Sequence, residues 1–219
     1  MKEYLCSNVK NVKVLVFDFD ETLYYSPDVR EYYIKYIKST ILNLSSLTEM
    51  ETDSLMKEVG FTMENKASPS FSSSCGRFGI QKNAWDNYRI DNFFQINYKN
   101  AESIDNNILR KLSMHYPMYV VTNEVYKNIL IKAERLGIDL SIFKKLLAPS
   151  AEALLSGNAK TKKELYQDII EGEHVMSNQV LVIGDRIKVD VEPMLELGGN
   201  GLVVTRPKEI EEFAVNYLL

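Results

Sequence analysis

The sequence has few of the residues that most often build metal centres and disulfide frameworks. Of its 219 residues, two are cysteine and two are histidine. Cys6 and Cys75 lie far apart in the sequence, so they form none of the short pairs that hold zinc, and we expect both to be structural or incidental. So few thiols are typical of a protein from a reducing compartment, and we place this one in the cytoplasm.

Long apolar runs and an excess of basic residues are also missing. No stretch approaches the roughly 18 apolar residues of a membrane span, and the N-terminus has no apolar run of signal-peptide length. Lys and Arg number 26 against 30 Asp and Glu, which gives a net charge of -4. Because nucleic-acid-binding domains carry a basic patch, we expect neither nucleic acid nor a membrane as a partner.

What the sequence does contain is a set of short, continuous apolar runs. They lie at residues 12–18, 118–122, 180–185 and 201–205, with a weaker one at 144–149. Such runs predict strands buried on both faces. The segment after Thr122 has helical spacing, from Tyr126 through Ile129 and Leu130 to Leu136, and ends at Gly137. This alternation predicts an α/β fold, with a Rossmann-like parallel sheet of about five strands and helices on both faces.

One long interval interrupts the alternation. It has no convincing buried strand, and Ser26-Pro27 predicts the start of a helix with Ser26 as its N-cap. Helical spacing recurs at residues 29–44, 55–59 and 80–88, whereas the Ser- and Gly-rich stretch 66–79 is typical of a loop. We therefore predict an α/β core of residues 1–23 and 110–219 and an inserted, all-helical domain of residues 24–109.

Polar residues follow the predicted strands at their carboxyl ends, where open α/β sheets bind their ligands. The first strand is followed by Asp18, Asp20, Glu21 and Thr22, the second by Thr122 and Asn123, and the fourth by Gly184, Asp185 and Asp190. Lys160 precedes a helix whose start, Thr161 to Glu164, has the pattern of a capping box. We expect these groups to converge at one edge of the sheet.

This ordered set resembles the haloacid dehalogenase-like hydrolase superfamily, most of whose members are phosphatases. The matching motifs are DxDxT at Asp18, Asp20 and Thr22, the strand-end hydroxyl of Thr122, Lys160 ahead of a helix, and GDxxxxD at Gly184, Asp185 and Asp190. The resemblance covers the whole chain, because the helical insert takes the place of the family's C1-type cap. Tyr24-Tyr25 and residues 136–140 look like the pyrimidine 5'-nucleotidase branch, and phosphoglycolate phosphatase-like enzymes share much of this frame.

The resemblance implies a Mg²⁺-dependent phosphatase that forms an aspartyl-phosphate. Asp18 would be the nucleophile and a metal ligand, and Asp20 would be the general acid and base and bind the metal through its backbone carbonyl. Asp185 would complete the metal ligands, and Asp190 would hold a ligand water or pair with Lys160. We expect neighbouring carboxylates to raise the pKa of Asp20, which suits an acid.

Thr122 and Lys160 would hold the phosphoryl oxygens, together with N–H groups of the loop after Asp18. Lys160 competes for its role with Lys162 and Lys163, which the capping box places in the helix and which we expect to be solvated. A purely structural Asp190 would be a helix N-cap, since Pro193 follows in the first turn. For substrate binding we add Asn123 and Arg77. Trp85 is either a stacking residue or part of the core.

The family cap implies a small phosphorylated metabolite, such as a nucleoside 5'-monophosphate or a sugar phosphate, and we expect a monomer. The presence of Asp20 favours phosphoryl transfer over dehalogenation, because dehalogenating members typically lack this aspartate. A phosphomutase or phosphotransferase uses the same two aspartates and is an alternative. A protein that binds a phosphate ligand without turnover is another, although the intact set of Asp18, Asp20, Lys160 and Asp185 argues against it.

Overall fold

The computed structural model describes residues 2–4, 9–64 and 70–219, and the chain divides into two compact units. The first contains Met1–Tyr25, Ala101–Ala153 and Asn158–Leu219, and the second contains Ser26–Asn100 and Leu154–Gly157. The division differs from the predicted one at residues 24–25, 101–109 and 154–157. Residues 101–109 belong with the first unit, where helix α5 (Asn106–Ser113) buries Leu109 and Leu112.

The first unit is built on a six-stranded sheet. Its order is β1 (Lys2–Tyr4), β8 (Asn200–Val203), β7 (Val180–Gly184), β2 (Val14–Phe17), β5 (Met118–Val121) and β6 (Lys145–Leu147). The five strands from β8 to β6 are parallel and coincide with the five apolar runs, which confirms the predicted α/β fold. Strand β1 joins the edge antiparallel to β8 and was not predicted, because KEY contains no apolar run.

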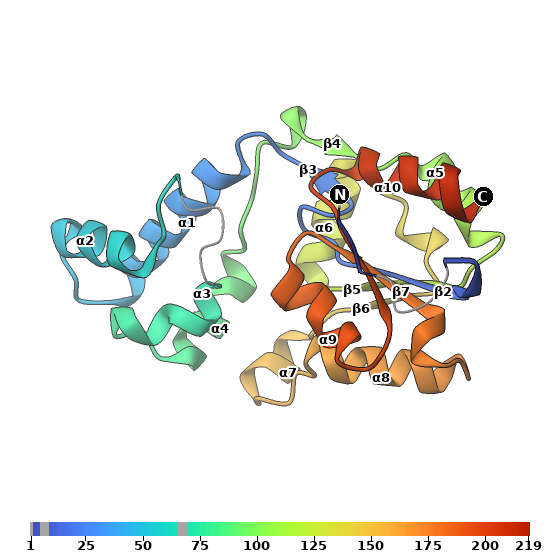
Figure 1. Cartoon of the computed structure of the whole chain (residues 1–219). Coiled ribbons are helices and arrows are strands. Elements are labelled where there is room, and N and C mark those ends of the chain that lie inside the picture. The colour runs from blue at the N-terminus through green and yellow to red at the C-terminus, as the bar shows by residue number, and fades with distance from the viewer. Residues whose placement is uncertain (1, 5–8, 65–69) are drawn as a thin grey trace. The chain divides into compact units, whose positions relative to one another are not determined.

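Helices cover both faces of this sheet (Figure 1). One face carries α8 (Lys162–Gly172) and α9 (Glu192–Leu195), and the other carries α5, α6 (Tyr126–Leu136) and α10 (Pro207–Phe213). Every side chain of β2, β5 and β7 is buried, which is why these strands are continuously apolar. Since β2 pairs with both β5 and β7, the carboxyl ends of these three strands are neighbours.

The second unit packs helices around aromatic side chains. Its helices are α1 (Val29–Leu44), α2 (Glu49–Val59), α3 (Phe71–Ser74) and α4 (Lys82–Asp91), and the 3₁₀ turn Cys75–Phe78 follows α3. The rings of Phe61, Phe71, Phe78 and Trp85 contact one another in the core. These contacts resemble a small domain core rather than a solvent-bridging helix pair.

Two predictions for this unit are wrong in detail. The first helix begins at Val29, and its N-cap is Asp28, which lies two residues after the predicted N-cap, Ser26. The stretch predicted as a loop is helical over residues 71–78, because its two phenylalanines are core residues and the hydroxyl of Ser70 caps α3 by accepting from the N–H of Ser73. Residues 66–69 of that stretch lie outside the described part of the chain.

A two-stranded ribbon lies where the chain passes between the units. Strand β3 (Tyr24–Tyr25) pairs antiparallel with β4 (Glu102–Ser103), and the Ile104 N–H donates to the Leu23 carbonyl at 2.9 Å. The departing and returning segments are therefore hydrogen-bonded to each other, and both belong to the first unit.

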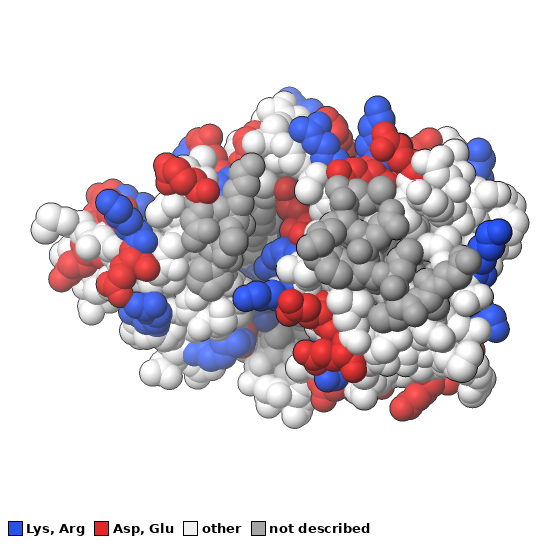
Figure 2. Space-filling model, in the orientation of Figure 1, with Lys and Arg blue, Asp and Glu red and all other residues white. Residues whose placement is uncertain are grey.

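The surface of each unit carries charges of both signs. Figure 2 shows acidic and basic side chains interspersed on the visible face. Among the described residues, no helix combines the length and the apolar character needed to cross a bilayer.

Close packing in the first unit predicts a strong effect at one glycine. A Cβ at Gly201 of β8 would lie 2.2 Å from Cγ1 of the buried Val191. We expect Gly201→Ala to lower the free energy of unfolding by about 1–3 kcal/mol, because a packed core resists added volume. Urea denaturation measures this change.

The matched control is Gly172→Ala, at the end of α8. A Cβ there would meet no described atom within 4 Å, and alanine favours the helix, so we expect unchanged or increased stability. Equal losses for the two variants would contradict the packing argument.

Candidate active site

The site begins in the turn that follows β2. Asp18 extends the parallel ladder by donating its N–H to the Ile183 carbonyl at 2.8 Å, and the N–H groups of Thr22 and Leu23 return to the Phe19 carbonyl. Glu21 has a φ of 58°, a left-handed conformation that costs most side chains energy but allows the tight reversal. Within the described chain, the N–H groups of Phe19 and Asp20 donate to no protein acceptor, so they are available to an anionic ligand.

A buried lysine, Lys162, connects the DxDxT motif with the GDxxxxD motif. The Nζ atom of Lys162 lies 2.5 Å from Oδ1 of Asp18 and 2.7 Å from Oδ1 of Asp190. All three side chains are buried. Burial lowers the pKa of a lysine, but here the charges of Asp18 and Asp190 outweigh it, so the pKa of Lys162 is raised and the ammonium stays charged.

The prediction that Lys160 is the lysine beside the strand-end acids is therefore wrong. The Lys160 ammonium is half exposed and pairs with Asp168 at 2.6 Å, on the outside of α8. The expectation that Lys162 is solvated is also wrong, because Lys162, Tyr166 and Ile169 share the buried face of α8. Their i, i+4, i+7 spacing was the signal that could have identified it.

The helix start itself agrees with the sequence. Thr161 is the N-cap of α8 and forms the predicted capping box with Glu164. Lys163 is partly exposed and pairs with Glu196 at 2.6 Å, as a solvated residue would. The capping box thus located the helix correctly but did not indicate which of its first lysines turns inward.

A π-helical turn, Ile187–Val191, brings Asp190 back to the end of β7. Oδ2 of Asp190 accepts from the Arg186 N–H at 2.8 Å, and the Tyr166 hydroxyl donates to its backbone carbonyl at 2.9 Å. A Cβ at Gly184 would lie 2.4 Å from the Asp190 Cβ, so glycine is required for this approach. Asp190 is not a helix N-cap, since α9 begins at Glu192 and Val191 precedes it.

Three carboxylates lie close together beside Lys162. Asp18, Asp185 and Asp190 each offer an oxygen within 4.8 Å of the others. Burial, followed by the charge of Asp190, raises the pKa of Asp18 to about 6, although Lys162 opposes the change. Burial and the charges of Asp18 and Asp190 raise the pKa of Asp185 well above its usual value. The site thus contains more negative than positive charge at its centre.

This donor set fits a divalent cation. Carboxylate oxygens are hard ligands, and a cation relieves their mutual repulsion. Asp190 already accepts from Lys162 and from the Arg186 N–H with its two oxygens, so Asp18 and Asp185 are the carboxylates better able to bind an ion directly.

Asp20 has a different environment. Its Oδ1 accepts from the Lys132 ammonium at 2.8 Å and from the Tyr24 hydroxyl at 2.7 Å. Burial would raise the pKa of Asp20, but the charge of Lys132 and these hydrogen bonds outweigh it, so the pKa is lowered. The expected raised pKa is therefore wrong, because a cation, rather than another carboxylate, is the nearest charge to Asp20.

Lys132 also belongs to the site, through its pair with Asp20, although no sequence motif above includes it. It lies on α6, is 2% exposed, and also pairs with Glu124 at 3.1 Å. Asn128, Lys132 and Leu136 form one buried row of the helix, whereas Tyr126 and Leu130 of the predicted apolar stripe are exposed. A polar i, i+4 pair in line with Leu136 was the available signal.

Thr122 and Asn123 lie at the end of β5, as expected from the sequence. Thr122 is buried, and its hydroxyl oxygen accepts from the Glu124 N–H at 3.1 Å. Accepting leaves the hydroxyl hydrogen able to donate. Asn123 is exposed.

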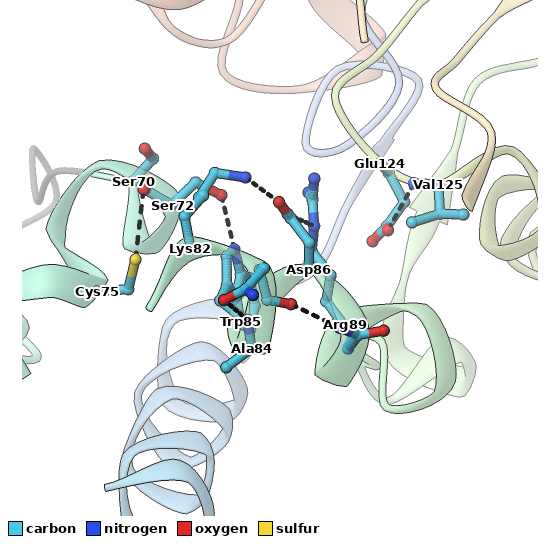
Figure 3. Close-up of polar contacts among 12 residues, drawn as sticks. Ser70, Ser72, Cys75, Lys82, Ala84, Trp85, Asp86, Arg89, Glu124 and Val125 are labelled. Carbon is cyan, nitrogen blue, oxygen red and sulfur yellow. Dashed lines mark hydrogen bonds and ion pairs between the residues drawn. The ribbon is translucent and has the colours of Figure 1, made fainter. Parts of the chain in front are cut away.

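The residues suggested for substrate binding in the helical unit have structural contacts. Arg77 is more than half exposed and pairs with Glu58 at 2.5 Å. The buried Trp85 donates from its indole to the Ser72 hydroxyl at 2.8 Å, and α4 also carries the ion pairs of Asp86 (Figure 3). Trp85 is therefore a core residue of the second unit.

Comparison with known proteins identifies the family. A sequence model of the haloacid dehalogenase-like hydrolases matches residues 12–198, which include the Asp18, Lys162 and Asp190 network. The chain belongs to this family. No curated protein gives a significant match to this hydrolase.

Solved structures share the fold of this hydrolase. A candidate phosphatase from Clostridium difficile is 19% identical with a TM-score of 0.58, and the match covers 97% of this chain and 100% of that one. A predicted phosphoglycolate phosphatase from Haemophilus somnus is 20% identical, with a TM-score of 0.51 and 90% and 86% covered. The candidate hydrolase YfnB from Bacillus subtilis, in a magnesium-bound form, is 14% identical, with a TM-score of 0.52 and 92% and 98% covered.

The buried network predicts unequal effects of two lysines in this hydrolase. In EDTA, we expect Lys162→Met to lower the free energy of unfolding by about 3 kcal/mol, since removing one partner of a buried ion pair leaves uncompensated charge. Lys160→Met removes an exposed pair, so its unfolding curve should overlay that of the wild type. A larger loss for Lys160→Met would contradict the assignment; guanidinium denaturation followed by circular dichroism provides the comparison.

Proposed function

We propose that this hydrolase is a Mg²⁺-dependent phosphatase that cleaves a small phosphomonoester through an aspartyl-phosphate at Asp18. The observation that carries the proposal is the buried Asp18 carboxylate at the end of β2, held by Lys162 beside Asp185. A buried acid cluster with one paired cation is suited to bind a metal and a phosphate together.

The proposed metal ligands are the carboxylates of Asp18 and Asp185 and the backbone carbonyl of Asp20, with Asp190 positioning a ligand water. A bound Mg²⁺ supplies charge neutralisation, which lets an anionic carboxylate approach a phosphate dianion. The magnesium-bound structure of YfnB, a protein of the same fold, supports the choice of this ion.

In the first half of the reaction, a carboxylate oxygen of Asp18 attacks phosphorus and the bond from phosphorus to the ester oxygen breaks. Lys162, the Thr122 hydroxyl and the N–H groups of Phe19 and Asp20 hold the phosphoryl oxygens. Asp20 gives a proton to the leaving alkoxide, which departs as the alcohol. The negative charge of a bound phosphate raises the pKa of Asp20 relative to the free protein and so favours this protonated form.

In the second half, water attacks phosphorus and gives its proton to Asp20. The bond from phosphorus to the Asp18 oxygen breaks, so inorganic phosphate forms and the Asp18 carboxylate is regenerated. Asp20 is ionised when this step begins, because it gave its proton to the leaving alkoxide in the first half.

The proposed substrate is a nucleoside 5'-monophosphate or a sugar phosphate. The helical unit would be the cap of the family, and its insertion between β3 and β4 supports this. Asn123 and Arg77 stay proposed substrate-binding residues. The cytoplasmic location and the monomeric state are also part of the proposal, and a panel of nucleoside and sugar phosphates distinguishes the two substrate classes.

The nucleophile is tested with p-nitrophenyl phosphate. We expect the wild type to release free phosphate with Mg²⁺ and to lose this activity in EDTA. Asp18→Asn should lower kcat by at least about 10³-fold, because an amide is a poor nucleophile, with an unchanged circular dichroism spectrum. Wild-type turnover by Asp18→Asn would rule out the nucleophile, and transfer without free phosphate would indicate a mutase.

The acid and base role is tested at Asp20. We expect Asp20→Asn to lower kcat by about 10²–10⁴-fold, which is the usual contribution of a positioned proton donor and acceptor. Because only the backbone carbonyl of Asp20 is proposed to bind the metal, Mg²⁺ affinity by calorimetry should stay within a few fold of the wild type. Loss of metal binding would assign Asp20 to the metal site instead.

A further inference from the structure

Lys132 is a buried cation whose contacts point to a specific task. We propose that Lys132 is a positioning residue that holds Asp20 in place for hydrolysis of the aspartyl-phosphate, with Tyr24 as a second anchor. The inference rests on the proposed phosphatase function and adds two residues to it.

The geometry leaves one carboxylate oxygen of Asp20 for chemistry. Lys132 and Tyr24 both contact Oδ1, at 2.8 and 2.7 Å, so neither donor takes Oδ2. The Asp20 side chain is 33% exposed, whereas Lys132 is 2% exposed and Tyr24 1% exposed. Lys132 and Tyr24 thus lie in the interior of the first unit, while the Asp20 carboxylate reaches its solvent-exposed surface.

The ammonium of Lys132 is itself fixed. It lies 3.1 Å from Oε2 of Glu124, and the other oxygen of Glu124 accepts from the Val125 N–H at 2.8 Å (Figure 3) and from the Asn128 amide at 3.2 Å. These bonds come from the first residues of α6 and the segment before it. Glu124 already accepts hydrogen bonds from these two donors, so its needs alone do not explain why Lys132 is buried here. The ion pair between Lys132 and Asp20 does explain it.

The second anchor comes from a different element. Tyr24 lies on β3, where its backbone pairs with Ser103 of β4, and its ring packs against Phe19 at 5.8 Å. One anchor therefore comes from a helix and the other from the ribbon. Two donors from separate elements restrain rotation of the Asp20 carboxylate more firmly than either does alone.

When the substrate is an aryl phosphate ester, the two halves of the reaction depend on Asp20 to different degrees. A p-nitrophenolate ion leaves without a proton, so transfer of its phosphoryl group to Asp18 does not require an acid. Water attack on the aspartyl-phosphate still requires Asp20 to accept a proton. A misplaced Asp20 should therefore slow release of phosphate and spare release of p-nitrophenolate.

The experiment is pre-steady-state hydrolysis of p-nitrophenyl phosphate by Lys132→Met. We expect kcat to fall by about 10–100-fold while kcat/KM stays within about threefold, with a burst of one p-nitrophenolate per site. Lys127→Met, an exposed lysine of the same helix, is the control and should match the wild type. Tyr24→Phe removes one hydroxyl only, and should give a smaller fall in kcat with the same burst even if Lys132→Met fails to fold.

A double variant separates positioning from folding. If Lys132 acts through Asp20, then adding Lys132→Met to Asp20→Asn should leave kcat unchanged from that of Asp20→Asn alone. Equal falls in kcat and kcat/KM without a burst, in both Lys132→Met and Tyr24→Phe, would overturn the inference. Absence of phosphate release by the wild type would instead overturn the proposed function on which the inference rests.

Discussion

The contact on which the site depends is the Lys162 ammonium held between Asp18 and Asp190. Several carboxylates are costly to bury together, because burial and mutual repulsion both oppose their ionisation. One buried cation offsets part of that cost, and other features of the site follow from the need to place it. Helix α8 begins at a position that turns its first residue inward, and Gly184 lacks the Cβ that would collide with Asp190.

A second lysine gives Asp20 the opposite electrostatic setting. Lys162 comes from α8 and Lys132 from α6, and these helices cover opposite faces of the sheet (Figure 1). Burial raises the pKa of Asp18 with help from the charge of Asp190, and Lys162 offsets only part of this, whereas at Asp20 the charge of Lys132 and the hydrogen bonds from Lys132 and Tyr24 outweigh burial, so the pKa is lowered. The two aspartates are only two residues apart, but the fold gives each its own counter-charge, and this difference suits them to the separate roles of nucleophile and proton carrier that we propose.

The strands could be predicted from the sequence because a strand buried on both faces leaves a local signature, a run of apolar residues. The edge strand β1 has no such run, since its pairing comes from backbone hydrogen bonds with β8. The acids of the site were predictable from motifs at strand ends. The lysines were harder to predict, because the spacing that groups Lys162 and Lys132 with buried residues does not by itself show how each helix is rotated against the sheet. The place before the capping box favours Lys160, yet Lys160 pairs on the surface and the buried face of α8 passes through Lys162.

The ribbon between β3 and β4 bears on how such a chain can be assembled. Tyr25 and Glu102 are directly opposite one another, at the separation of about 5 Å that is usual for antiparallel partners. The segment between them therefore leaves and re-enters the α/β unit at a hairpin. The two ends of this segment are held together by the hydrogen bonds between β3 and β4. Loop-closure entropy grows only slowly with length, at about 0.6 kcal/mol for each doubling, so a hairpin of this kind can accept a whole helical module at a moderate entropic cost. The fold of the α/β unit is therefore not interrupted by the insert, because the helical unit stands where a short turn could connect β3 and β4.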